Sequence, residues 1–189
     1  GEGVMGGATS DDTLTGQAGN DGINGRGGVD HLDGGDGIDT LIFDGTGTSQ
    51  TINFGLGSTR YDLLNGGSIK GFENVLFNGG AGNETISVKG GQNALDGNGG
   101  SNDYIEIDMS AARGSVNGFL QSGGIFWANG GDYGITSART FETIRVLGGS
   151  GDDTINARTS GGVLSEDLML LYGNGGNDIL SGGKRDDFI

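Results

Sequence analysis

Hydrophobic residues recur at nine-residue intervals over much of this chain. From Gly7 the sequence reads as the consecutive units GATSDDTLT, GQAGNDGIN, GRGGVDHLD and GGDGIDTLI, which end at Ile42. The eighth position of each unit is aliphatic, and positions seven and nine are mostly polar or small. Because successive residues of a strand point to opposite faces, this pattern predicts a short strand with one side chain directed inward.

The remainder of each unit predicts a turn. Its first positions are rich in glycine, and its sixth position is Asp12, Asp21, Asp30 or Asp39. A unit of nine residues is too small to bury its apolar side chain alone, so the units must stack on one another. The sequence therefore predicts an all-β solenoid.

Further units extend the pattern to three blocks. The second block, residues 79–106, contains GGAGNETIS, VKGGQNALD and GNGGSNDYIE, and the third, residues 148–189, contains GGSGDDTIN, GNGGNDILS and GGKRDDFI. As in the first block, residues 1–42, the eighth position is Leu or Ile in every unit, except that GNGGSNDYIE has one extra residue and carries Ile105 at its ninth position. Met5 stands where the eighth position of a preceding unit would fall, and the chain stops at the eighth position of an unfinished one. We expect a piece of a longer array.

Two plainer segments, residues 43–78 and 107–147, separate the blocks and are related to each other. Phe72-Glu73-Asn74-Val75 precedes the second block as Phe141-Glu142-Thr143-Ile144 precedes the third, at a constant offset of 69 residues. Each segment lacks the aliphatic residues for a core of its own. We expect both to continue the solenoid as larger coils, with the two phenylalanines directed inward.

Composition narrows the partners of the chain. The 189 residues include 45 glycines but no proline or cysteine, which excludes disulfides and thiolate metal sites. The formal net charge of −15 argues against nucleic acid, since phosphate backbones attract basic surfaces. No apolar run approaches the length of a membrane span, so no membrane insertion is expected.

The turns carry the ligands that calcium prefers. Ca²⁺ takes about six to eight oxygen ligands, and glycines with positive φ can turn backbone carbonyls toward one point while the Asp carboxylate supplies charge. Position five holds residues that tolerate left-handed conformations better than most, and we expect such conformations at this position. These residues are Asn20, Asn83, Asp152 and Asn177. The turns therefore predict a row of calcium sites, whereas the larger coils of segments 43–78 and 107–147 are expected to hold no calcium.

The pattern G-G-x-G-x-D-x-U-x, in four phased tandem units, resembles the calcium-binding repeat of the RTX family of secreted bacterial proteins. The resemblance implies a right-handed parallel β-roll in which two units make one coil and calcium ions lie between turns of successive coils. It pairs Asp12 with the Asp30 turn, Asp21 with the Asp39 turn, Glu84 with Asp103, and Asp153 with Asp178. The last pair is 25 residues apart, so the opposite half-coil must bulge by seven residues.

The resemblance also implies the ligands of several calcium ions. The acidic candidates are Asp12, Asp21, Asp30, Asp36, Asp39, Glu84, Asp103, Asp153, Asp178 and Asp187. The glycine candidates are Gly16, Gly19, Gly25, Gly28, Gly34, Gly37, Gly148, Gly151, Gly173 and Gly176. The Asp21, Asp30 and Asp39 turns are the strongest candidates, followed by those of Asp153 and Asp178. Elsewhere the pattern departs, because Glu84 adds a methylene, Asn93 brings no charge, and Ser10 and Arg185 replace the fourth-position glycine.

A glycine-rich solenoid held by Asn and Asp turns without metal is the structural alternative. Adjacent coils lie about 4.8 Å apart, and like charges at about 5 Å repel by about 1 kcal/mol in water and by more in a dry turn. An array of such carboxylate pairs is not expected to fold without cations.

The sequence predicts a non-catalytic protein. His31, the only histidine, stands at the variable seventh position, which disfavours a Ser-His-Asp triad. We expect a calcium-stapled segment that joins neighbouring repeats of a secreted or cell-surface bacterial protein, leaves the cell unfolded by type I secretion and folds on meeting external calcium. The alternative is a module that binds polysaccharide or a surface glycan through segments 43–78 and 107–147, where Trp127 lies.

Overall fold

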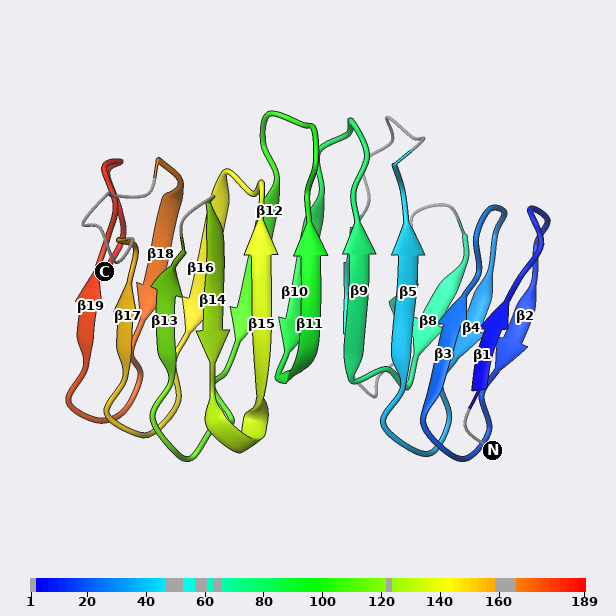
Figure 1. The fold of residues 1–189 in the computed structure, drawn as a ribbon, viewed down its shortest axis with the longest axis horizontal. Helices are drawn as coiled ribbons and strands as arrows, with labels where there is room; N and C mark the ends of the chain where they lie inside the picture. The colour runs from blue at the N-terminus through cyan, green and yellow to red at the C-terminus, as the bar shows by residue number, and fades with distance from the viewer. Residues whose placement is uncertain (1–2, 47–52, 57–60, 63–65, 122–123, 159–165) are drawn as a thin grey trace.

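The computed structural model describes residues 3–46, 53–56, 61–62, 66–121, 124–158 and 166–189. The chain forms an elongated body of strands in two facing layers, with its termini at opposite ends (Figure 1). Besides its strands, the described part contains one short 3-10 helix, η1 (Gly131–Tyr133). The all-β prediction is confirmed.

One face of the body is a single ten-stranded sheet, which we call the first face. In spatial order it contains β1 (Gly3–Gly6), β3 (Asp21–Asn24), β5 (Thr40–Asp44), β9 (Asn74–Asn78), β11 (Gly91–Asp96), β15 (Gly134–Arg139), β14 (Ile125–Asn129), β13 (Asn117–Leu120), β17 (Thr154–Asn156) and β19 (Ile179–Ser181).

The opposite layer, the second face, consists of two sheets. The four-stranded sheet contains β2 (Thr13–Thr15), β4 (His31–Asp33), β8 (Ser68–Lys70) and β7 (Tyr61–Asp62). The five-stranded sheet contains β6 (Asn53–Gly55), β10 (Thr85–Lys89), β12 (Tyr104–Asp108), β16 (Thr143–Leu147) and β18 (Leu168–Tyr172).

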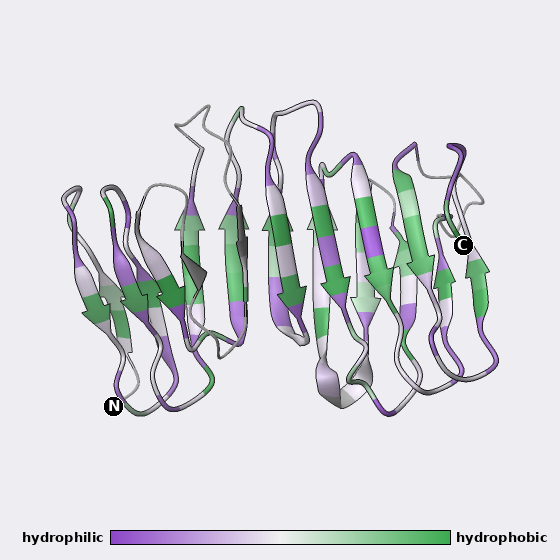
Figure 2. Ribbon diagram, turned by 180° about the vertical axis from the view of Figure 1, so that it is seen from behind, coloured by the Kyte–Doolittle hydropathy of each residue, from purple (hydrophilic) through white to green (hydrophobic). Residues whose placement is uncertain are grey.

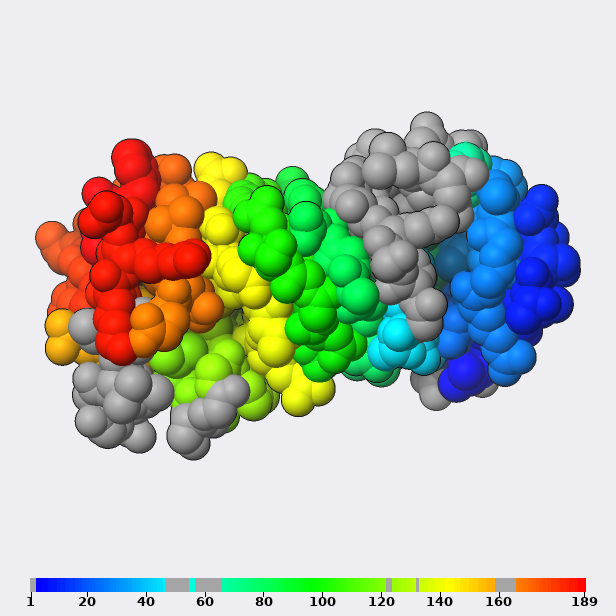
Figure 3. Space-filling model, turned by 90° about the horizontal axis from the view of Figure 1, so that it is seen from above, coloured from blue at the N-terminus to red at the C-terminus, as the bar shows by residue number. Residues whose placement is uncertain are grey.

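Consecutive nonapeptide strands alternate between the two faces, so that two units complete one coil. Thus β1, β3 and β5 pair in parallel on the first face, while β2 and β4 pair in parallel on the second. This is the parallel β-roll that the repeat predicts. Seen from above, the chain proceeds from its N-terminal to its C-terminal end along the long axis (Figure 3).

The eighth-position side chains form the core between the faces. Strand register places Ile23 beside Leu41 on the first face and Ile86 beside Ile105 on the second, and all four are at most 1% exposed. Figure 2 shows hydrophobic residues gathered on the strands and hydrophilic residues in many of the turns. Stacking of identical small units therefore supplies a core that no single unit could make.

The segment 43–78 widens the second face. Its strand β9 lies on the first face between β5 and β11, as the next coil requires. The same segment supplies β8, which pairs with β4, and also the extra strands β7 and β6, of which β7 is antiparallel to β8 and β6 is parallel to β10.

The segment 107–147 widens the first face instead. After β12 the chain forms β13 next to β17, returns through β14, and then forms β15 next to β11. The expectation of purely parallel stacking is wrong here, because β14 is antiparallel to both of its neighbours. Three strands are an odd number, so β15 leaves in the direction that parallel pairing with β11 requires.

The two phenylalanines that the sequence analysis singled out are buried. Phe72 and Phe141 are each 1% exposed and belong to the continuous hydrophobic core. Each stands in the turn that precedes a strand, β9 and β16 respectively. Their inward orientation is therefore confirmed.

Helices in the described part of the chain are too short, and not apolar enough, to cross a membrane.

Candidate metal centre

The sixth-position carboxylates form a ladder of hydrogen bonds along the turns. In each step the backbone N–H of position six donates to the carboxylate one coil further on. Asp12 N donates to Asp30 Oδ1 at 3.0 Å, and Asp21 N donates to Asp39 Oδ1 at 2.7 Å. The glycine turns bring these carboxylates into one row because every unit repeats the same backbone path.

The same bond joins the pairs in the later blocks. Glu84 N donates to Asp103 Oδ1 at 2.8 Å, and Asp153 N donates to Asp178 Oδ1 at 2.9 Å. The structure thus brings together the four pairs of turns that the resemblance implies. The seven-residue bulge was expected between Asp153 and Asp178, where residues 159–165 lie outside the described part.

Several carboxylate oxygens in these turns are buried and have no hydrogen-bond partner. They are Asp21 Oδ2, Asp39 Oδ2, Asp103 Oδ2, Glu84 Oε1 and Glu84 Oε2. A buried charge without a partner destabilises a fold by several kcal/mol, so these oxygens call for a cation. At Asp12 and Asp153 the second oxygen instead accepts a backbone N–H, from Ala8 at 2.7 Å and from Gly149 at 2.8 Å.

Backbone carbonyls converge on these carboxylates at the first glycine of several units. A Cβ added at Gly16 would collide with the Gly34 carbonyl oxygen and lie 2.8 Å from Asp21 Oδ2. A Cβ at Gly79 would likewise collide with the Gly97 carbonyl oxygen and lie 2.7 Å from Glu84 Oε2. Carboxylate and carbonyl oxygens together are the ligands of a hard cation, and this donor set fits Ca²⁺.

Other first-position glycines also lie against the carboxylate of their own unit. A Cβ at Gly25, Gly148 or Gly173 would collide with the carboxylate of its own unit, which is Asp30, Asp153 or Asp178. Asp187 Oδ1 accepts the Met169 N–H at 2.9 Å and continues the row. Asp36 differs from the other acidic candidates because it is exposed and stands at position three, outside the ladder.

The fourth-position glycines allow adjacent coils to approach closely. A Cβ at Gly37 would collide with the Gly19 carbonyl oxygen, and one at Gly176 with the Gly151 carbonyl oxygen. At Gly28, where φ is 122°, a Cβ would lie 2.5 Å from the backbone of the Asp12 turn, at the Ser10 carbonyl carbon. Side chains at these positions would force the coils apart.

The prediction for position five is wrong. Positive φ falls on positions two and four, for example 75° at Gln17 and 119° at Gly19, and none of the four position-five residues singled out from the sequence adopts it. The side chains of Asn20, Asn83 and Asp152 instead accept the position-five N–H of the next coil, as Asn20 Oδ1 does from Ile38 at 3.1 Å. A second ladder therefore runs beside the first, with the opposite direction of donation.

Two ladder residues escaped the sequence analysis. Glu73 Oε2 accepts the Asp39 N–H at 2.9 Å, and Glu142 Oε2 accepts the Asp103 N–H at 2.7 Å. The signal was the repeated Phe-Glu pair, in which only the phenylalanine was given a role. Asn93 is a neutral rung, because its amide accepts from Val75 N at 3.0 Å and also donates to a carbonyl and a hydroxyl oxygen.

No three Asp, Glu, His or Cys side chains converge as a metal-binding group within the described ranges. The candidate sites consist of paired carboxylates and backbone carbonyls, a composition that suits calcium rather than a transition metal.

Burial changes the acidity of the ladder. It raises the pKa of Asp30, Asp103 and Asp153 above the usual value of an aspartate. At Glu84, burial and then the negative charge of Asp103 raise the pKa to about 7, from a usual value of 4.5. Without a cation, the folded chain therefore favours protonated carboxyl groups.

This shift predicts how pH acts on the calcium-free chain. Between pH 4.5 and about 7 the folded state keeps a proton on Glu84 that the unfolded state releases. The stabilisation is fully present below pH 4.5 and is lost as the pH rises through about 7. Circular dichroism in calcium-free buffer should therefore show more folded chain at pH 5 than at pH 8, and Glu84→Gln should weaken this difference. An equal or larger folded fraction at pH 8 would contradict the prediction.

Substitution of a first-position glycine should destabilise the roll. Gly16→Ala would place a methyl group against the Gly34 carbonyl, and we expect a loss of about 1–3 kcal/mol with weaker calcium binding. Gly27→Ala is the matched control, since its methyl group would meet only Thr9, at 3.8 Å. Denaturant titration in saturating calcium measures both, and equal midpoints would show that the cradle tolerates a side chain.

Comparison with protein families agrees with this geometry. A family model described as the RTX calcium-binding nonapeptide repeat, in four copies, matches residues 6–41, 145–159 and 170–189. The matched ranges cover most of the first and third blocks and leave the second unmatched. Searches of curated proteins and of solved structures gave no match.

Proposed function

Because the chain belongs to the RTX calcium-binding nonapeptide-repeat family, we propose that it is a calcium-binding structural segment of a secreted or cell-surface bacterial protein. The observation that carries the proposal is the set of buried carboxylate oxygens without partners in Asp21, Asp39, Glu84 and Asp103, which lie beside glycines that also face a backbone carbonyl. Several calcium ions bound between successive coils would neutralise these oxygens and hold the coils together.

Calcium would also determine when and where the segment folds. Sites of this kind form only when two coils meet, so the free energy of calcium binding is free energy of folding. In calcium-poor cytosol the chain would stay unfolded and competent for type I secretion, and external calcium would fold it. The absence of cysteine and proline and the net charge of −15 agree with that route.

In this proposal the segment is a structural unit and not a catalyst. It would act as a stiff spacer between neighbouring repeats of the parent protein, and any catalytic activity of that protein would reside elsewhere. The repeat itself is a calcium-binding unit, and the sixth-position carboxylates of Asp30, Asp39, Asp103 and Asp178 accept backbone N–H groups in the ladder.

Calcium titration tests the proposal. Calorimetry of the 189-residue chain should show several ions bound at millimolar calcium or below, and Asp21→Asn should weaken binding because it removes a buried charge. Asp186→Asn is the control, since that side chain is exposed. A chain that binds no calcium at millimolar concentrations would refute the proposal.

One observation favours a second candidate function, the binding of a polysaccharide or surface glycan. Trp127 and Phe119 are in register on neighbouring strands of the first face, and Phe119 is 43% exposed. Trp127 also lines a hollow of about 260 Å³ with Ile125, Asp96 and Arg139. Aromatic faces beside polar groups suit a sugar ring.

The fluorescence of Trp127, the only tryptophan, tests this candidate. With calcium already saturating, a recognised oligosaccharide should change the emission, and Arg139→Ala should weaken the response. Emission that is unaffected by a panel of bacterial and host glycans would count against the glycan function and leave the calcium proposal untouched.

A further inference from the structure

Two short turns outside the nonapeptide units share one design. Residues 70–73 (KGFE) and 139–142 (RTFE) each consist of a basic residue, a residue with positive φ, a buried phenylalanine and a glutamate. The φ angle is 67° at Gly71 and 57° at Thr140. Threonine rarely adopts this conformation, so the second turn keeps it against the preference of its residue.

Each turn puts its glutamate where a nonapeptide puts its aspartate. Glu73 and Glu142 accept the N–H groups of Asp39 and Asp103, at 2.9 and 2.7 Å. These bonds repeat the step by which Asp39 itself accepts the N–H of Asp21, at 2.7 Å. The two glutamates therefore occupy the sixth position of the following coil.

Each turn also supplies a backbone carbonyl that faces the first-position glycine of the coil before it. A Cβ at Gly34 would collide with the Gly71 carbonyl oxygen, and a Cβ at Gly97 would lie 2.5 Å from the Thr140 carbonyl oxygen. The Gly16 Cβ meets the Gly34 carbonyl in the same way in the first block. A turn that is shorter than a nonapeptide turn thus presents the same two oxygen donors.

The carboxylate oxygens that these carbonyls approach are among the buried oxygens that have no hydrogen-bond partner. Asp39 Oδ2 and Asp103 Oδ2 are buried, and both residues are 0% exposed. They lie 2.8 and 3.0 Å from the Cβ positions of Gly34 and Gly97, at which the new carbonyls also arrive. A charged oxygen without a partner and a carbonyl oxygen therefore converge at both places.

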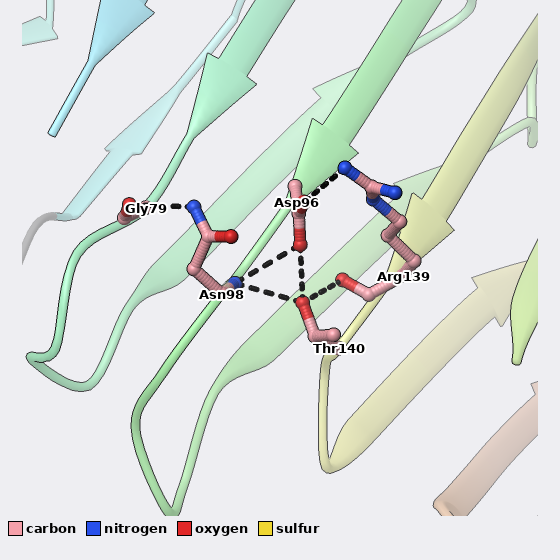
Figure 4. Close-up of polar contacts among 5 residues, drawn as sticks. All are labelled: Gly79, Asp96, Asn98, Arg139 and Thr140. Carbon is pink, nitrogen blue, oxygen red and sulfur yellow. Dashed lines mark hydrogen bonds and ion pairs between the residues drawn. The ribbon is translucent and has the colours of Figure 1, made fainter. Parts of the chain in front are cut away.

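Basic residues fix the two turns to the coil before them. Lys70 pairs with Asp33 at 2.8 Å, and Arg139 pairs with Asp96. Figure 4 shows the second case, in which the Thr140 hydroxyl also contacts Asp96, at 2.5 Å, and accepts the Asn98 N–H at 2.7 Å. Because Lys70 and Arg139 are paired with these aspartates, the two basic side chains do not neutralise the ladder carboxylates.

From this geometry we propose that Glu73 and Glu142 each complete one further calcium site, against the Asp39 turn and the Asp103 turn respectively. The inference rests on the proposed calcium-binding function and extends it to turns that are not nonapeptides. Each site would join a nonapeptide block to the plainer coil that follows it, so that calcium secures the junctions as well as the blocks.

The test uses E73Q, E142Q and the double variant in the 189-residue chain. Glutamine keeps the oxygen that accepts the backbone N–H but removes the charge. E166Q is the matched control, because Glu166 is exposed and pairs only with Lys184 in the described structure. Calcium titration in competition with a chelator should show one site weakened at least tenfold in each single variant, two in the double variant and none in E166Q.

Circular dichroism separates a ligand from a merely structural group. A ligand role predicts that excess calcium restores the wild-type spectrum of each variant. A spectral defect that excess calcium does not reduce would overturn the inference, as would variants that bind the same number of ions with unchanged affinities. A wild-type chain that binds no calcium would instead overturn the proposed function itself, so the two failures are distinguishable.

Discussion

Removal of calcium should unfold the chain. At pH 8, chelator is expected to abolish the β signal in circular dichroism and to expand the molecule, and millimolar calcium should restore the signal and the compact state. The physical reason is the ladder, in which Asp21, Asp39, Glu84 and Asp103 keep buried oxygens that no protein group satisfies. Without cations these charges repel one another within coils about 4.8 Å apart.

Two controls test whether the folding requires calcium itself. Magnesium at the same concentration should fail, because Mg²⁺ demands a tight octahedral shell and gives up water reluctantly. Sodium chloride at equal ionic strength should fail as well, since screening does not replace ligation. A chain with the same spectrum in excess chelator as in calcium would be a metal-free solenoid, and the proposed function would then be wrong.

The second large effect is expected from the phenylalanine at the last junction. Phe141→Ala should reduce the free energy of unfolding by about 3–5 kcal/mol, because it removes a ring that is only 1% exposed and leaves a cavity in the core. The loss should concentrate in residues 148–189, whose first coil stacks directly on β16. Hydrogen exchange in saturating calcium should therefore accelerate at β17 and β19 before it does at β3.

Phe119→Ala is the matched control for this prediction. Phe119 belongs to the same segment but lies on the outer surface with 43% exposure, so its truncation should cost much less. Phe141→Leu, which keeps most of the volume, should fall between the two. Equal losses for Phe141→Ala and Phe119→Ala would mean that the buried ring does not hold the third block.

The sequence was sufficient for the repeating part of the fold. A period of nine residues determines the coil, because the apolar eighth position can be buried only if Ile23 stacks on Leu41 and its equivalents. The same period predicts which turns face each other, and the Asp12 N–H does bond to Asp30 Oδ1.

The plainer segments could not be predicted to the same depth. No period specifies that β13 should lie beside β17 rather than β11, since that choice depends on which neighbour buries Gly118 and Leu120. The role of Glu73 was hidden for a related reason. Its turn is shorter than a nonapeptide turn, so its alignment with Asp39 appears only when the coils are stacked. The conformation at position five could not be predicted either, because an Asn that tolerates positive φ is equally suited to accept a hydrogen bond.

The two widened faces have a mechanical consequence. The extra strands β6 and β7 lie on the second face, whereas β13 and β14 lie on the first. Strands are spaced about 4.8 Å apart, so two unmatched strands would lengthen one side of the rod by about 10 Å and curve it. Because each side receives two, the axis can run on without a bend. Deletion of either segment alone should arc the rod, in opposite directions for the two deletions, whereas loss of both should leave a shorter rod that is again straight.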